Sequence, residues 1–305
     1  MHMTTIGIKN SDCQIKNYII SELESIKTID FDLIHDNYMA GDTFFIECSL
    51  REGLFAKIKE NKAYDELIYN LAIIISDVII NNYETKLIKK IIKDFCVYLT
   101  DYEKAHIYEL ADKLIKKEDN ADDRIFYKQS RKNRIIKKIM NYLKTENIII
   151  IDGFVKFRLN EYMKELYDVV EKAVEEYITE REYNEFIKLL RYFVEIQESK
   201  IDTIHILTAK DGGYILMDSK KNIINCEYYD DIKPELIDNE INNDDILISN
   251  LITIAPKKIC IHNIEGFANK ELMKTIRNVF FDRTEICKNC QICGFGSVKI
   301  IKEFN

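Results

Sequence analysis

The chain has 305 residues, of which 47% are apolar and 31% charged, with a formal net charge of −8 at pH 7. This composition is that of a globular protein with a full hydrophobic core, and the length favours two ordinary domains over one large one. The acidic balance argues against nonspecific binding of nucleic acid by the molecule as a whole.

No segment predicts a membrane span or a secretory signal. The most apolar stretch, residues 71–80, is interrupted by Ser76 and Asp77 and is about half of the ~20 residues that a spanning helix needs. The N-terminal residues contain no apolar signal core. Five of the eight cysteines are scattered, a pattern typical of reduced thiols, namely Cys13, Cys48, Cys96, Cys226 and Cys260. We therefore expect a cytoplasmic protein that does not bind membranes.

The start of the chain predicts a small βαββ module. Residues 4–8 read as a strand, and residues 13–26 carry apolar side chains at helical spacing. Residues 31–35 and 43–50 flank an Ala-Gly-Asp turn at 40–42, which predicts a hairpin.

The next part of the chain predicts mostly helix, because apolar residues recur at helical spacing through residues 61–144. The segment 116–123, KKEDNADD, has no apolar face to bury and predicts a surface loop. We place the domain boundary there. Residues 1–120 then form the N-terminal module with its helices, and residues 121–305 form a second region.

An Asp-Gly pair at residues 152–153 predicts a type I′ hairpin turn between strands at 148–151 and 154–157. Apolar residues at helical spacing then predict two separate long helices, one over 163–177 and one over 186–194.

The last hundred residues predict alternating strands and helices. The expected elements are a hairpin of 203–208 with 214–217, an acidic loop at 227–244, a helix capped by Asp244 or Asp245 and running to 254, a strand at 258–262 and a helix at 270–281. The fold class is therefore α+β and helix-rich, with a βαββ N-terminal module, central helices and a C-terminal mixed α/β part that ends in a cysteine cluster.

That cluster, Cys287-x2-Cys290-x2-Cys293, is the strongest chemical signal in the sequence. A Cys-x2-Cys step brings two thiolates to one ion within a tight turn, and zinc sites commonly use it. Zinc takes four ligands, and His262 and Cys260 are the candidates for the fourth, because residues two apart on a strand face the same side. We favour His262. A closed set of four favours a structural over a catalytic metal, although the pattern alone leaves both open.

Two other interpretations of the cluster remain at this point. In the ferredoxin pattern C-x2-C-x2-C-x3-C-P the fourth cysteine would fall on Ser297, so an iron–sulfur cluster is less favoured than zinc. The cysteines could also be ordinary or redox-active thiols.

A basic helix is predicted over residues 124–144, which contain eight basic residues and no acidic one. Followed by the expected hairpin, it resembles the recognition helix and wing of a winged-helix module, which could neutralise phosphates in a DNA groove. Alternatively, the basic side chains of this helix form a solvated face, or they pair with the acidic stretch 230–245. The candidate nucleic-acid-binding residues are Lys128, Arg131, Lys132, Arg134, Lys137 and Lys138.

Enzyme signatures give no positive indication. The sequence contains no GxGxxG, GxxxxGK[ST], HExxH or GxSxG motif, and no catalytic residue is nominated. An enzyme is disfavoured, and a metal-dependent enzyme is kept as an alternative.

The C-terminal half resembles a known family. The segments IDGFVKFRL at 151–159, EYNEFIKLLR at 182–191 and DILISNLITIAPK at 245–257, with the terminal cysteines, resemble the YtxC-like proteins over about residues 147–293. That family is linked to sporulation in endospore-forming bacteria. The resemblance implies a genetic context and no mechanism.

The resemblance also bears on the candidate ligands. His262 matches the histidine after the family's P-K-K-apolar strand, and Cys287, Cys290 and Cys293 match its terminal cysteines. Cys260 stands where an aliphatic residue is expected, so we interpret it as core. The leading hypothesis is a cytoplasmic, sporulation-associated regulatory or protein-interaction factor with a structural zinc site and an unidentified protein partner. A DNA-binding regulator and a metal-dependent enzyme are the alternatives.

Overall fold

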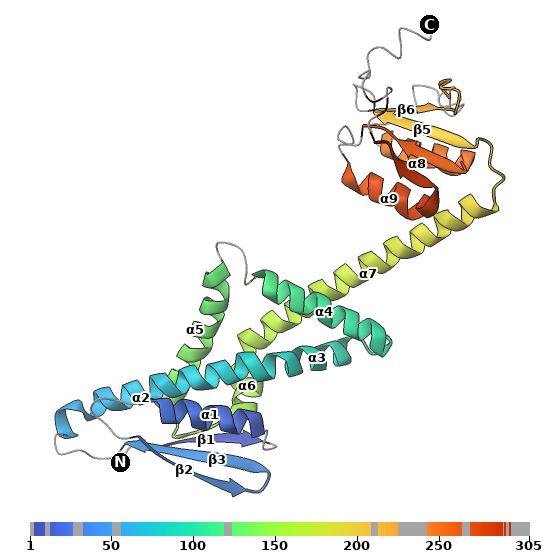
Figure 1. The fold of residues 1–305 in the computed structure, drawn as a ribbon. Helices are drawn as coiled ribbons and strands as arrows, with labels where there is room; N and C mark the ends of the chain where they lie inside the picture. The colour runs from blue at the N-terminus through green and yellow to red at the C-terminus, as the bar shows by residue number, and fades with distance from the viewer. Residues whose placement is uncertain are drawn as a thin grey trace, which may run out of the picture. The chain divides into compact units, whose positions relative to one another are not determined.

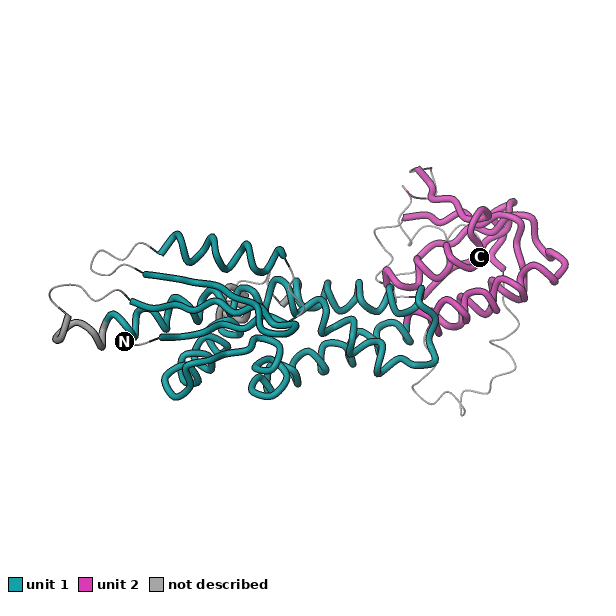
Figure 2. Tube along the Cα trace, turned by 90° about the horizontal axis from the view of Figure 1, so that it is seen from below, with its two compact units in different colours: residues 1–179 teal, residues 180–305 magenta. Residues whose placement is uncertain are grey.

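The computed structural model describes residues 3–9, 13–26, 33–50, 56–118, 124–208, 213–224, 243–263, 269–288, 290 and 293; for 56–62, 117–118 and 124–129 only the backbone is described. Figure 1 shows the helices and strands in chain order. They form two compact units, Met1–Thr179 and Glu180–Asn305 (Figure 2), divided within the long helix α7 (Asn160–Ile196). The boundary predicted near residue 120 lies inside the first unit, in a segment outside the described residues.

The first unit contains a four-stranded sheet of order β2-β3-β1-β4, built from β1 (Met3–Lys9), β2 (Leu33–Ala40), β3 (Thr43–Leu50) and β4 (Ile148–Ile150). Strand β3 is antiparallel to both neighbours, and β4 is parallel to β1. Helix α1 (Cys13–Ser25) connects β1 to β2. This order confirms the predicted βαββ module. Gly41 has φ of +63° in the β2–β3 turn, a conformation that glycine adopts without steric cost.

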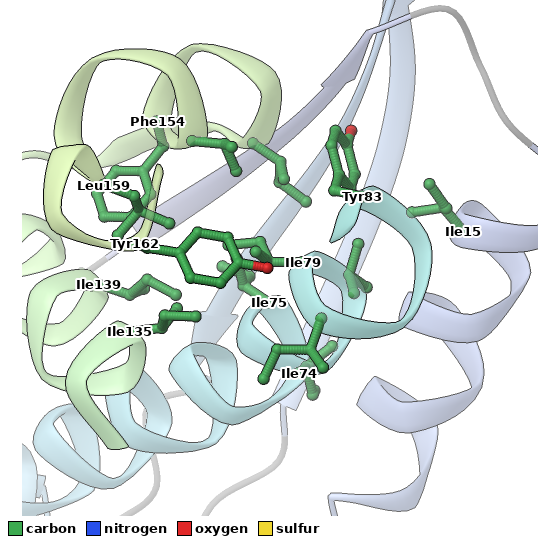
Figure 3. Packing of buried hydrophobic residues seen from close by; sticks show 14 of the residues in the cluster. Ile15, Ile74, Ile75, Ile79, Tyr83, Ile135, Ile139, Phe154, Leu159 and Tyr162 are labelled. Atoms are coloured by element: carbon green, nitrogen blue, oxygen red, sulfur yellow. The ribbon is translucent and has the colours of Figure 1, made fainter. Parts of the chain in front are cut away.

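The rest of the first unit is helical, as predicted. Its helices are α2 (Ala56–Val78), the π-helix η1 (Ile79–Tyr83), α3 (Glu84–Phe95), α4 (Asp101–Glu118), α5 (Arg124–Leu143), α6 (Ile151–Arg158) and the first part of α7. Figure 3 shows how they share one core: Ile75 and Ile79 face Ile135 and Ile139 of α5, and Tyr162 of α7 packs alongside. This core joins the helices to the sheet, because Ile6 and Ile46 belong to the same buried cluster.

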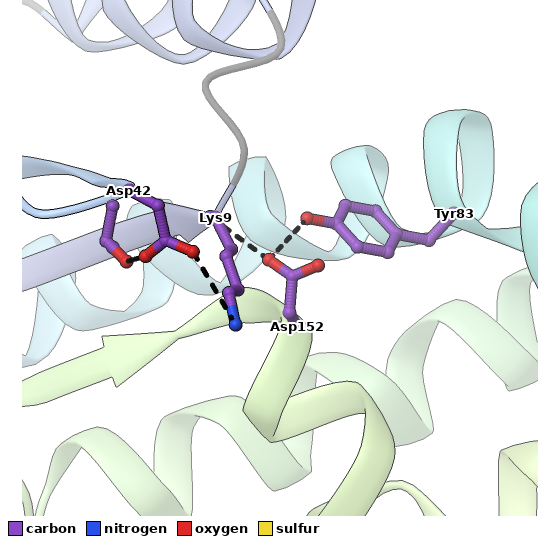
Figure 4. Close-up of polar contacts among 5 residues, drawn as sticks. Lys9, Asp42, Tyr83 and Asp152 are labelled. Atoms are coloured by element: carbon purple, nitrogen blue, oxygen red, sulfur yellow. Dashed lines mark hydrogen bonds and ion pairs between the residues drawn. The ribbon is translucent and has the colours of Figure 1, made fainter.

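The hairpin predicted over residues 148–157 is wrong. Strand β4 ends at Ile150, and residues 152–153 lie in the first turn of α6. The backbone of β4 pairs with β1 instead of with a second hairpin strand. The Asp152 carboxylate accepts hydrogen bonds from the Lys9 backbone N–H and the Tyr83 hydroxyl, each at 3.1 Å, as Figure 4 shows. An acidic residue in a helix's first turn is also favoured by the helix dipole.

The two helices predicted over 163–177 and 186–194 are one continuous helix, α7. The intervening residues 178–185, ITEREYNE, contain no glycine or proline. Glycine and proline are the residue types that most disfavour helix interiors. Without them, nothing in this segment ends the helix. The break between the two apolar patterns is instead a stretch without burial, because none of the side chains of residues 174–186 is buried.

The second unit contains a sheet of order β6-β5-β7-β8, built from β5 (Thr203–Thr208), β6 (Tyr214–Met217), β7 (Lys258–Ile261) and β8 (Thr284–Ile286). Strands β5, β7 and β8 are mutually parallel, and β6 is antiparallel to β5. Helices α8 (Asn243–Ile254) and α9 (Lys270–Phe280) complete it, so the expected order of elements is confirmed. The predicted acidic loop lies almost entirely outside the described residues.

One face of this second sheet packs on helices. Ile204, Ile206, Ile259 and Ile261 belong to one buried cluster with residues of α8, α9 and the end of α7. None of the described helices in either unit combines the length and the apolar character needed to cross a bilayer.

Candidate metal centre

The opposite face of the second sheet carries the cysteine cluster. Successive side chains of a strand point to opposite faces, so His205 and Cys260 lie on the face away from the core that holds their isoleucine neighbours. His262 follows β7 directly, and Cys287 follows β8. Both candidate ligands therefore lie at the C-terminal ends of adjacent parallel strands.

Backbone hydrogen bonds hold these two positions. The His262 N–H donates to the Ile206 carbonyl, and the Cys287 N–H donates to the Ile261 carbonyl, each at 2.9 Å. These bonds extend the sheet ladder by one residue past each strand end. His262 and Cys287 are thus placed side by side by the sheet itself.

The four predicted ligands come together. The Nδ1 atom of His262 lies 3.4 Å from the Sγ atoms of both Cys290 and Cys293. The Sγ of Cys293 lies 3.7 Å from that of Cys287 and 4.0 Å from that of Cys290. All four ligand atoms lie within 4.8 Å of one another. The set could hold one metal ion.

These separations suit a tetrahedral ion better than a disulfide. Tetrahedral zinc, with bonds of about 2.3 Å to sulfur and about 2.0 Å to nitrogen, separates two sulfurs by about 3.8 Å and sulfur from nitrogen by about 3.5 Å. A disulfide would bring two sulfurs to about 2.0 Å. The observed 3.4–4.0 Å spacings match the first geometry.

His262 also contacts a second histidine. Its Nε2 atom lies 2.9 Å from Nδ1 of His205, and the two rings lie 5.1 Å apart between centroids. A metal bound at Nδ1 would leave the ring proton of His262 on Nε2, from where it could be donated to His205. Such a hydrogen bond on the far ring nitrogen sets the tautomer and orientation of a metal-binding histidine.

The protonation states of the site follow from its burial. Burial, together with His205, lowers the pKa of His262, whose side chain is only 2% exposed. Neutral imidazole is the form that binds metal. Burial raises the pKa of the Cys287 thiol to about 11. A metal ion would therefore have to displace the proton of the Cys287 thiol as it binds.

Cys260 lies beside the four ligands without belonging to them. It is half-buried, and burial, with the neighbouring Cys290, raises the pKa of its thiol. Its ligand atom groups with those of His205 and His262. Between the two candidates for the fourth position, the geometry thus favours His262.

Sequence reasoning missed His205. The alternation of β5 identifies the face on which it lies, but nothing local places β5 next to β7. That neighbourhood is set by the sheet order, which pairs His205 with Cys260, 55 positions further along the chain.

The basic helix α5 belongs to the first unit, and several of its charges have partners there. Three ion pairs join it to α2 and α7: Lys132 with Asp77 at 2.7 Å, Lys138 with Glu161 at 2.9 Å, and Arg134 with Glu165. Arg131 is buried and Lys137 is exposed, while the side chain of Lys128 lies outside the described residues. No wing is formed at residues 148–157. DNA binding by this helix stays a prediction.

Comparison with known proteins gives two matches in sequence and none in structure. A sequence profile of the YtxC-like family matches residues 69–285, a range that includes His262 and ends two residues before Cys287. A protein of Bacillus subtilis (strain 168) described as "Uncharacterized protein YtxC" is 32% identical over 193 residues, covering 60% of this chain and 64% of the relative. The chain thus matches slightly less than two thirds of that relative's length. No solved structure matches.

Proposed function

The chain belongs to the YtxC-like family, and we propose that its second unit is a zinc-stabilised module through which the protein binds a partner protein. In this proposal His262, Cys287, Cys290 and Cys293 hold one Zn2+. The ion ties the ends of β7 and β8 to Cys290 and Cys293.

The observation that carries the proposal is the closed ligand set. Three sulfurs and one nitrogen within 4.8 Å complete the tetrahedral coordination of zinc, with no position left for a substrate or for an activated water. Catalytic zinc keeps such a position open. The close grouping also favours one ion over a multi-iron cluster, whose ligands bind separate metal atoms.

The partner-binding part of the proposal is supported by an apolar stripe on the last turns of α7. Ile187, Leu190 and Val194 pack into the core of the second unit. On the same turns, four large apolar side chains spaced 3, 4 and 3 residues apart are 41–59% exposed: Phe186, Leu189, Phe193 and Ile196. Exposed apolar side chains that adjoin one another on a surface are typical of interaction sites. The spacing is that of a helix that packs on another helix.

The link to sporulation is supported by the family resemblance alone. On that resemblance we propose that the protein has a regulatory role in endospore formation; the resemblance gives no partner. In a spore-forming host, loss of the gene should reduce the yield of heat-resistant spores, and a Cys290→Ser copy should fail to restore it.

Metal content tests the central claim. The full chain, purified under reducing and oxygen-free conditions, should contain about one zinc per chain by elemental mass spectrometry. Cys290→Ser and His262→Asn should lose the zinc and melt at lower temperature. Cys13 is an exposed cysteine in the first unit, so Cys13→Ser is the matched control and should keep the zinc. Absence of zinc from the wild type, or iron with sulfide in its place, would refute the proposal.

The stripe is tested separately. Phe193→Asp should abolish specific association with a partner while leaving zinc content unchanged, and Lys188→Asp on the same helix should leave both unchanged. If Phe193→Asp associates like the wild type, the stripe is not the binding surface.

A further inference from the structure

The first unit contains a cleft that the proposed function does not use. It has a volume of about 700 Å3 and is lined by residues of α3, α6 and α7, with Tyr83 of η1. Pockets for small molecules have volumes of roughly 300–1,000 Å3. Every lining residue belongs to the first unit, so the cleft is complete within it.

The apolar part of the lining comes from all three helices. Leu87 and Ile91 belong to α3, Val155 to α6 and Met163 to α7. Leu87 and Met163 are only half-buried, and Tyr167 of α7 is 48% exposed. These side chains offer an apolar surface that the protein itself leaves partly open to solvent.

Three lysines stand at this cleft, one on each helix: Lys90 on α3, Lys156 on α6 and Lys164 on α7. All three are exposed. Among the side chains that the structure describes, no acidic group forms an ion pair with any of them. This differs from α5, where neighbouring carboxylates pair with the basic side chains.

Two carboxylates also line the cleft, and one is already engaged. Asp152 accepts hydrogen bonds from the Tyr83 hydroxyl and the Lys9 N–H, so it holds η1, β1 and α6 together at the cleft wall (Figure 4). Its charge is further offset by the N-terminal dipole of α6. Asp94 is exposed and remains as one opposing charge against three lysines.

The cleft wall includes an irregular piece of backbone. Residues 79–83 form a π-helix between α2 and α3, and Tyr83 is its last residue. A π-helical turn adds one residue to the helical repeat and so rotates the side chains that follow it; such turns are frequent at functional sites. Here the rotation accompanies a nearly buried Tyr83 whose hydroxyl reaches α6.

We propose that this cleft binds a small amphipathic anion, a molecule with an apolar body and one carboxylate or phosphate group. The apolar body covers Leu87 and Met163, the half-buried apolar side chains of the lining. The anionic group lies among Lys90, Lys156 and Lys164, whose three ammonium groups outnumber the nearby Asp94. A neutral molecule of the same shape gains only the apolar contact.

The chain contains no tryptophan, which provides a clean reporter. Tyr167→Trp places a single indole on the cleft wall of the full-length protein. Its fluorescence is titrated with decanoate, decyl phosphate, decanol and inorganic phosphate. We expect saturable binding of decanoate, decyl phosphate or both, and binding of decanol about ten-fold weaker or less. The first two probes separate a carboxylate ligand from a phosphate ligand.

The lysines are tested in the same background. Replacing Lys90, Lys156 and Lys164 together by Gln should weaken binding of the anionic probe about ten-fold, since each exposed charge contributes modestly. Lys172→Gln, exposed on α7 and outside the cleft lining, is the matched control and should bind as before. An unchanged melting temperature in the triple variant shows that the fold is intact.

Several results would overturn the proposal: no saturable signal with either anion, equal affinity for decanol, equal affinity for inorganic phosphate, or no effect of the triple substitution. Ligand binding could leave the fluorescence of the indole unchanged, so the wild-type chain is also titrated with both anions by isothermal titration calorimetry. If neither a fluorescence change nor heat of binding is observed, the cleft does not bind these anions.

Discussion

The Nδ1 atom of His205 lies 2.9 Å from the Nε2 atom of His262, whose other ring nitrogen faces two cysteine sulfurs at 3.4 Å. His262 therefore has one ring nitrogen directed at the candidate metal position and the other at the ring of His205. His205 comes from β5 and His262 from the end of β7, so the parallel pairing of these strands creates the contact. In the proposed zinc site, His205 would act by orienting the ligand His262.

We expect His205→Ala to weaken zinc binding without abolishing it. Loss of a hydrogen-bond partner behind a metal ligand typically lowers affinity about 10–100-fold. Competition for zinc with a chromophoric chelator measures the change. Cys260→Ser, on the neighbouring strand and the same sheet face, is the control and should bind zinc like the wild type. An unchanged affinity in His205→Ala would show that His262 is oriented by its backbone alone.

Two glycines should respond to alanine in opposite directions. Gly153 lies within α6, and a Cβ atom there would meet nothing within 4 Å. Alanine should stabilise the protein by about 0.5–1 kcal/mol, since it is the better helix former. Gly41 has φ of +63°, where alanine should cost about 1 kcal/mol.

Urea unfolding of the two glycine variants, followed by circular dichroism, measures both changes. The two variants also test whether residues 152–153 lie in a helix or in a hairpin turn. In a type I′ turn Gly153 would have positive φ, and its replacement would destabilise the protein as at Gly41. Loss of stability in both variants would thus indicate a hairpin turn at residues 152–153 instead of a helix.

Cys48 should resist alkylation in the folded protein. Its side chain is fully buried on β3, and burial raises the pKa of the thiol to about 12. At pH 8 only roughly one molecule in 10,000 then carries the reactive thiolate. Cys13 is exposed at the start of α1 and should react with iodoacetamide. Peptide mass spectrometry resolves the two sites, and equal labelling rates without urea would contradict the buried sheet face.

The same shift makes stability depend on pH in a defined direction. The folded pKa of Cys48 lies above the value of about 8.5 for an unfolded thiol. The folded state therefore holds the proton more tightly. This contribution to stability is complete below about pH 8.5 and falls as the pH rises toward 12. Cys48→Ala should reduce the loss of stability on going from pH 8 to pH 10, as measured by urea unfolding.

The spacing of apolar residues predicted helices well, whereas short turn motifs predicted turns poorly. The apolar spacing of residues 13–26 and 270–281 predicted α1 and α9 to within one residue. The Asp-Gly pair at 152–153 predicted a turn and was wrong, because Asp152 serves equally well as the acidic residue of a helix's first turn. Which role it takes depends on Lys9 and Tyr83, distant in sequence.

The amino-acid sequence by itself determined the helix-rich α+β class, the βαββ start and the three terminal cysteines spaced three residues apart, because these depend on neighbours along the chain. Tertiary structure alone decided that His205 stands behind His262, that carboxylates of α2 and α7 pair with basic residues of α5, and that three helices leave a lysine-edged cleft. Each of these depends on the order of strands or the packing of helices. Such contacts form between residues tens of positions apart, and no local spacing encodes them.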